Sequence, residues 1–72
     1  MAMAKIWRNR IEAGTQLFGN CPAKYRADVI GLIREDIEEG KRFTLNDLKG
    51  LVSSGKMTEA EYKEITGEDY DG

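Results

Sequence analysis

Apolar residues recur at helical spacing through the first quarter of the chain. One face carries an apolar residue or glycine every three or four positions, while the opposite face is polar. We predict an amphipathic helix over residues 4–18, closed by Gly19 and Asn20. Gly14 weakens it locally, since glycine costs about 1 kcal/mol against alanine inside a helix. The face consists of Met3, Trp7, Ile11, Gly14 and Phe18.

A second helix is predicted over residues 23–39. Pro22 suits its first position because the N–H that proline lacks has no helical partner there, so Cys21 or Asn20 is the expected cap. Gly40 follows as a left-handed terminator. The apolar face of this helix consists of Tyr25, Val29, Leu32, Ile33 and Ile37.

The last thirty residues repeat one local pattern at two places. A threonine, Thr44 or Thr58, is followed three positions later by an acid, Asp47 or Glu61. The threonine hydroxyl can accept from the acid's backbone N–H while the carboxylate accepts from the threonine N–H, which makes a capping box. Helices are therefore predicted over residues 45–54 and 59–66, ending at Gly55 and Gly67.

Apolar pairs brace the first turn of each of these helices. Phe43 with Leu48, and Met57 with Tyr62, have the spacing of hydrophobic staples. The last helix has about two turns and is too short to persist unless it packs on something. No strand or hairpin pattern occurs. The sequence predicts an all-α fold in one domain of residues 1–72, with two longer N-terminal helices packed on a C-terminal helical hairpin.

The carboxyl-terminal segment also resembles a known family. Gly-Lys-Met-Thr at positions 55–58 and Tyr-Lys-Glu-Ile-Thr-Gly-Glu-Asp-Tyr at positions 62–70 are similar to the turn and ending of the XkdX family of short phage and prophage proteins. The resemblance covers residues 42–70. It implies a phage or prophage origin and no known reaction, ligand or catalytic residue. Residues 1–41 depart from it as a basic helical extension.

Composition removes most catalytic chemistry. The 72 residues include no histidine and one cysteine, Cys21. Histidine-based triads and Cys/His zinc sites are excluded, and no intrachain disulfide can form. Cys21 lies next to a helix start, which can lower a thiol pKa, although a structural role is the stronger expectation. The acidic tail from Glu68 to Asp71 is too short for a calcium loop. We expect no enzyme, cofactor or metal.

Charge is distributed unevenly along the chain. Residues 1–34 carry six basic and two acidic groups, a net of +4, whereas residues 35–72 carry five basic and eleven acidic groups, a net of −6. The acidic run 35–39 is interpreted as a solvated helix face. Its place at the helix C-terminus is unfavourable for the helix dipole, so Lys41, Arg42 or the basic patch of another chain is expected to compensate it.

Basic and aromatic residues near the amino terminus form the candidate site. They could bind a partner protein, or a phosphate or nucleotide through paired arginines and stacked rings. The third alternative is that the rings belong to the core and the cations are solvated or pair with the acidic half. If the protein binds a partner protein and no nucleotide, replacing Arg8 and Arg10 by alanine is expected to leave the melting temperature nearly unchanged. The candidates are Trp7, Arg8, Arg10, Lys24, Tyr25 and Arg26, with Lys5 beside them.

Self-association is expected from an apolar surplus that one small bundle does not easily cover: Met3, Ile6, Trp7, Phe18, Leu32 and Ile33. We predict a homodimer through the first two helices. The predicted function is a non-enzymatic phage or prophage interaction protein. The alternative is a counter-defence protein that inhibits a bacterial immune protein or sequesters a nucleotide signal. No DNA binding is expected through the hairpin, whose second helix is acidic, and no membrane binding. The expected location is the host cytoplasm, with the virion as alternative.

Overall fold

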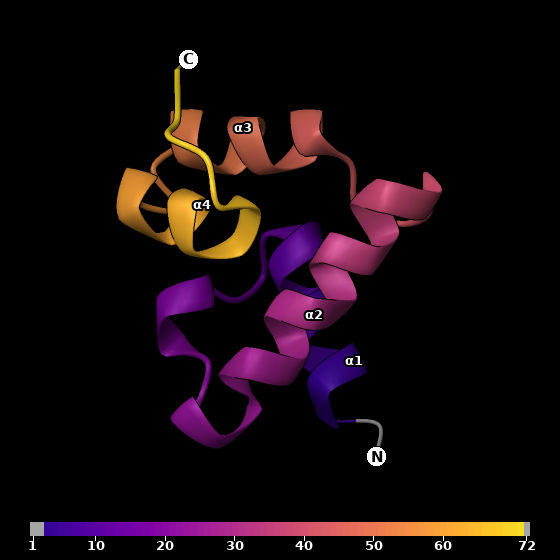
Figure 1. Ribbon diagram of the computed structural model, residues 1–72. Coiled ribbons are helices and arrows are strands. Elements are labelled where there is room, and N and C mark those ends of the chain that lie inside the picture. The colour runs from indigo at the N-terminus through magenta and orange to yellow at the C-terminus, as the bar shows by residue number, and fades with distance from the viewer. Residues whose placement is uncertain (1–2, 72) are drawn as a thin grey trace.

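The computed structural model describes residues 3–71, and every regular element in that range is helical. Four α-helices and one short 3₁₀ turn follow one another along the chain (Figure 1). This confirms the predicted all-α class. The elements are α1 (Met3–Ala13), η1 (Phe18–Asn20), α2 (Ala23–Glu39), α3 (Leu45–Ser53) and α4 (Glu59–Thr66).

The first helix ends five residues earlier than predicted. Gly14 adopts φ +80°, a left-handed conformation that favours glycine, and donates its N–H to the Ile11 carbonyl at 3.1 Å. The Thr15 N–H bonds to the Arg10 carbonyl at 3.0 Å, which completes a Schellman-type ending. Gly14 therefore terminates α1 rather than weakening a longer helix.

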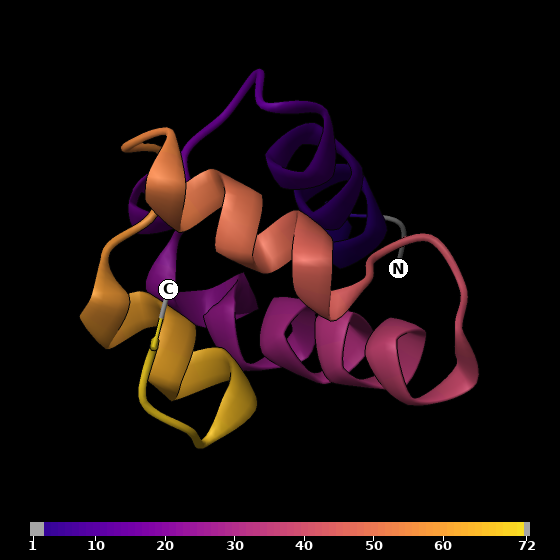
Figure 2. The same ribbon diagram turned by 90° about the horizontal axis from the view of Figure 1, so that it is seen from above.

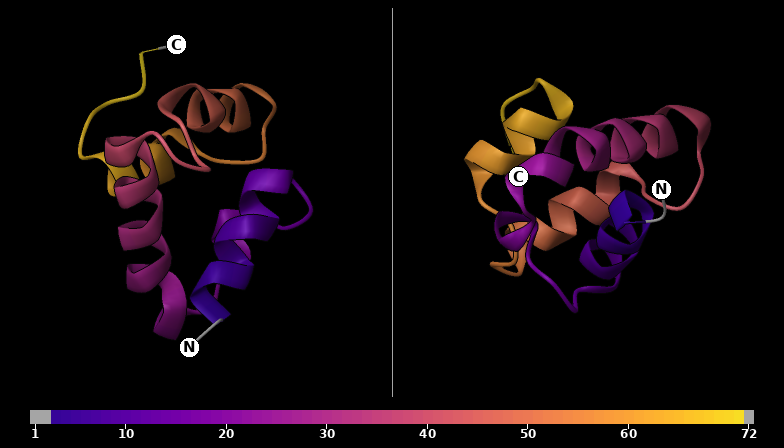
Figure 3. Two further views of the ribbon diagram at one scale, coloured as in Figure 1. Left: turned by 90° about the vertical axis from the view of Figure 1, so that its right-hand side faces the viewer. Right: turned by 90° about the horizontal axis from the view of Figure 1, so that it is seen from below.

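The link between α1 and α2 is a crossover. Both helices run in the same general direction, so residues 14–22 return along the length of α1 before α2 begins (Figure 3). Phe18 and Cys21 in this link are buried, which fixes its path. The expected cap of α2 was wrong by one or two residues: Pro22 itself is the N-cap, and no side chain caps the helix. Gly40 at φ +67° ends α2 as predicted.

Both predicted capping boxes are present. The Asp47 N–H donates to Thr44 Oγ1 at 3.1 Å, and the Thr44 N–H donates to Asp47 Oδ2 at 3.0 Å. The corresponding distances between Glu61 and Thr58 are 3.1 and 2.9 Å. These reciprocal bonds satisfy helix N–H groups that would otherwise lack partners. The bounds of α3 and α4 are therefore as predicted, to within one residue.

One core is filled from both halves of the chain. Its buried apolar side chains come from α1, η1, α2, α3, α4 and the loops between them, and the acidic hairpin packs mainly on α2 (Figure 2). The predicted apolar surplus is smaller than expected, because Phe18 and Ile33 are fully buried within this single chain. The core consists of Ile11, Phe18, Cys21, Val29, Ile33, Phe43, Leu48, Met57, Tyr62 and Ile65.

Two glycines give a matched test of these backbone assignments. Gly50 lies inside α3 with open space where a Cβ would go, so Gly50→Ala is expected to stabilise the fold by about 0.5–1 kcal/mol. Gly55 also has open space but adopts φ +83°, so Gly55→Ala is expected to destabilise it by about 1 kcal/mol or more. Urea unfolding measures both, and equal effects of the two substitutions would contradict the described ends of α3.

Candidate functional site

Arg8 forms a buried ion pair across the first two helices. Its Nη1 lies 2.8 Å from Asp36 Oδ2, and the two side chains are only 13% and 4% exposed. The Arg8 Nε also donates to Asn9 Oδ1 at 2.9 Å. The acidic run 35–39 is therefore not wholly a solvated face, since Asp36 points inward. Its spacing from Val29 and Ile33 on α2 was the available signal, because these three positions share one helix face.

Arg26 joins the start of α2 to α4. Its Nε and Nη2 donate to the two carboxylate oxygens of Glu64 at 2.8 and 2.7 Å, a bidentate pair. The guanidinium carbon also lies 4.6 Å from the centre of the Phe18 ring. The hydrogen bond and charge of Arg26 lower the pKa of Glu64, against an opposing effect of desolvation.

The other predicted site residues occupy separate environments. Trp7 and Tyr25 are half-buried and pack against the core. Lys24 is exposed, with its Nζ 5.1 Å from the Tyr25 ring centre, and Arg10 is exposed on α1. The structure thus divides the six candidates among two ion pairs, the core margin and the surface. Binding by this set stays a prediction, and an anion would have to displace Asp36 or Glu64 to reach Arg8 or Arg26.

Of the two cations expected to compensate the acidic run 35–39, Lys41 pairs with it and Arg42 pairs with α1 instead. Lys41 Nζ lies 2.8 Å from Glu39 Oε1 just beyond α2, as the unfavourable placement of acids at that helix end suggested. Arg42 Nη1 lies 3.6 Å from Glu12 Oε1 on α1. Several cations therefore connect segments that are distant in sequence.

Cys21 is a buried part of the core. It is 5% exposed, and burial raises the pKa of its thiol, with a smaller opposing effect from Arg26. The lowered pKa considered from its place before a helix is thus wrong. Because the thiolate is the nucleophilic form, a raised pKa disfavours reactivity at neutral pH.

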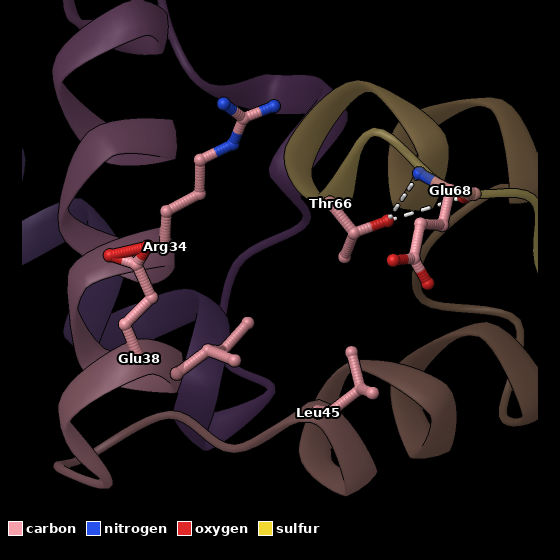
Figure 4. A pocket seen from close by; sticks show the side chains of 6 residues that line it. Arg34, Glu38, Leu45, Thr66 and Glu68 are labelled. Atoms are coloured by element: carbon pink, nitrogen blue, oxygen red, sulfur yellow. Dashed lines mark hydrogen bonds between the residues drawn. The ribbon is translucent and has the colours of Figure 1, made fainter.

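A groove opens where α2, α3 and α4 meet, which we call the α2–α3–α4 groove (Figure 4). Its volume is about 290 Å³. Leu45 is 38% exposed in it and Ile37 is half-buried, so part of its lining is apolar. It is lined by Arg34, Ile37, Glu38, Leu45, Thr66 and Glu68.

The polar residues of the groove differ in how far they are engaged. Arg34 Nε donates to the Ile65 carbonyl near the end of α4, a favourable place for a cation. Thr66 Oγ1 accepts from the Glu68 N–H at 3.1 Å. Within residues 3–71, the carboxylates of Glu38 and Glu68 make no ion pair. Sequence reasoning missed this groove because it depends on how α2 lies against the hairpin; the apolar Leu45 at an exposed first turn was the only hint.

The segment that contains the helical hairpin matches a known protein family. Residues 39–70 match the family model described as "Phage uncharacterised protein (Phage_XkdX)". This segment is similar to the XkdX family of phage proteins, and the match covers less than half of the 72 residues. The match confirms the resemblance seen in the sequence and begins three residues earlier. The XkdX segment contains α3 and α4, whereas α1 and nearly all of α2 precede it.

No curated protein and no solved structure matches the chain. Across residues 3–71, none of the helices has the length and apolar character to cross a membrane. The same residues contain no group of three or more acidic or cysteine side chains arranged to hold a metal ion.

The buried ion pair gives a direct test. Arg8→Ala leaves the Asp36 carboxylate buried without its partner and is expected to destabilise the fold by about 3–5 kcal/mol. This revises the expectation that alanine at Arg8 and Arg10 would be nearly neutral. Arg10→Ala, on the exposed side of α1, is the control and should change stability by no more than about 0.5 kcal/mol. Urea unfolding measures both.

A double substitution distinguishes the cost of an unpaired buried charge at Asp36 from the cost of lost packing at Arg8. Arg8→Met combined with Asp36→Leu removes both charges and should recover most of the lost stability, because apolar replacement of a buried pair is often neutral. An Arg8→Ala variant as stable as Arg10→Ala would contradict the assignment.

The Arg26–Glu64 pair predicts a pH effect at the acid end. The pKa of Glu64 is lowered in the folded state, so the pair's contribution is present above the unfolded value of about 4.3 and is lost as pH falls through the folded pKa. Because the side chains are 31% and 41% exposed, the contribution is about 0.2–1 kcal/mol. Urea unfolding of Glu64→Gln against the unchanged protein should give a stability difference at pH 7 that shrinks below about pH 4. A difference independent of pH would contradict it. Glu35→Gln, at an exposed acid on α2 that makes no ion pair within residues 3–71, is the control.

Proposed function

We propose that this phage protein is a non-enzymatic interaction protein that binds another protein through the α2–α3–α4 groove. The observation that carries the proposal is the exposure of Leu45, at 38%, beside the half-buried Ile37 in a groove of about 290 Å³. A folded domain this small has few large apolar side chains to leave in water, and only Leu17 is as exposed among the large apolar residues of the described chain.

The groove has the composition of a protein-binding site. Its apolar lining is bordered by polar and charged side chains, which is the usual arrangement of an apolar centre within a polar rim. Burying a leucine side chain contributes about 1.5–3 kcal/mol, and rim charges favour one partner over another. Ile37 and Leu45 would supply affinity, while Glu38 and Glu68 would supply selectivity.

The uses of the other titratable groups support a non-enzymatic role. Arg8, Asp36, Arg26 and Glu64 hold elements together, and the Cys21 thiol is buried with a raised pKa. Covalent catalysis needs an activated nucleophile beside a base, and these groups are already engaged in the fold. Inhibition of a bacterial immune protein is one use that such a groove would serve. Sequestering a nucleotide is less well supported, because two of the three arginines proposed for it, Arg8 and Arg26, are paired with carboxylates.

Paired substitutions of exposed leucines test the proposal. Leu45→Glu places a charge in the groove, whereas Leu17→Glu places one at an equally exposed leucine before η1. Tagged protein should capture a specific protein from infected or lysogenic bacteria, Leu45→Glu should reduce capture at least about tenfold, and Leu17→Glu should retain it. Capture that is equal for all three proteins would contradict the proposal. Circular dichroism of each variant establishes that it is folded.

A further inference from the structure

We propose that the partner bound in the α2–α3–α4 groove is a second copy of this chain, which inserts the outer side of its α1. This inference rests on the proposed function of the groove and names its occupant. We define the α1 stripe as Met3, Ile6 and Arg10. The contact would join the α1 stripe of one copy to the groove of the next, head to tail.

The α1 stripe is an apolar and basic surface left over by the fold. Its residues are spaced by three and four positions, which places them along one side of the helix. Met3 and Ile6 are half-buried but are not among the side chains that pack against the core, whereas Ala4 and Trp7 are. Arg10 is exposed and makes no ion pair within residues 3–71.

The groove is complementary to the α1 stripe in apolar character and in charge. Ile37 and Leu45 offer apolar contacts to Met3 and Ile6 of another copy, and the carboxylates of Glu38 and Glu68 are available to an arginine. A helix commonly binds a groove through side chains at i, i+3 and i+7, here two apolar residues and one arginine. Arg34 also lines the groove, but its Nε already donates to the Ile65 carbonyl, so the two acids are the charges left to attract a cation.

The placement of the two surfaces requires a second molecule. The groove is lined by residues of α2 and α3 and of the end of α4, and Figures 1 and 2 show α1 on the other side of α2 from α4. One copy therefore cannot place its own α1 in its own groove. Because the two contacting surfaces are different, the contact is heterologous, and each added copy leaves one groove and one α1 stripe free.

Sedimentation velocity of two complementary variants tests this arrangement. Leu45→Glu disables the groove and keeps the α1 stripe, while Ile6→Glu disables the stripe and keeps the groove. The unchanged protein should form a series of species that lengthens with concentration, and each variant alone should be monomeric, with its dissociation constant raised at least about tenfold. An equimolar mixture of the two should form a 1:1 dimer and nothing larger.

Control variants distinguish loss of this contact from unfolding and from nonspecific association. Arg10→Glu is a second stripe variant at an exposed position, and it should form the same 1:1 dimer with Leu45→Glu but none with Ile6→Glu, since both stripes of that mixture are disabled. Leu17→Glu should associate as the unchanged protein does. Raising the salt concentration from 0.05 to 0.5 M should weaken association, since it shortens the range of charge attraction from roughly 14 to 4 Å. Circular dichroism confirms that each variant is folded.

Failure of self-association can be distinguished from failure of the groove as a protein-binding site. A monomer at every concentration up to about 1 mM, the range of very weak affinity, would overturn the inference. An unchanged protein that dimerises while the mixed variants stay monomeric would overturn the head-to-tail contact in favour of a two-fold one. Neither result excludes binding of a different protein in the groove. The capture experiment tests that proposal separately, and it fails if Leu45→Glu captures partners as well as the unchanged protein does.

Discussion

The structure depends on a single core that neither half of the chain can fill alone. Phe18 and Ile33 come from the amino-terminal part, while Phe43, Tyr62 and Ile65 come from the XkdX segment, and all five are essentially without solvent contact. Domains of this size bury a smaller share of their surface than larger domains do, so each large buried side chain matters to stability. Without α2, the short helix α4 would have few apolar partners beyond α3 and would not be expected to persist.

Ion pairs also hold the two halves of the chain together. The basic first half and acidic second half meet in pairs that span the molecule, above all Arg8 with Asp36 and Arg26 with Glu64. Arg34 adds a bond to the Ile65 carbonyl. The Arg26–Glu64 pair and the Arg34 bond hold α2 against α4, beside the α2–α3–α4 groove, while the Arg8–Asp36 pair holds α1 against α2. The amino-terminal extension thus stabilises the XkdX segment and also contributes Arg34, Ile37 and Glu38 to its candidate binding surface.

The parts of the fold that could be predicted are those encoded by local chemistry. The capping boxes at Thr44 and Thr58 and the glycine after each helix fix the bounds of α3 and α4 from neighbouring residues alone. The early end of α1 at Gly14 was missed, because a glycine within a periodic pattern can continue or end a helix. Burial of Asp36 and the groove beside Leu45 were missed as well. Both arise from how distant elements pack, and the apolar pattern does not specify that placement.

The central claim is that the XkdX segment of this chain folds only on the helices that precede it. The most direct measurement is far-ultraviolet circular dichroism of a fragment of residues 41–72 beside the whole chain, each followed through a thermal melt. The account predicts that the fragment has little helix and no cooperative transition, whereas the whole chain melts cooperatively. A fragment that is as helical as its share of the whole chain and that melts cooperatively by itself would contradict the account.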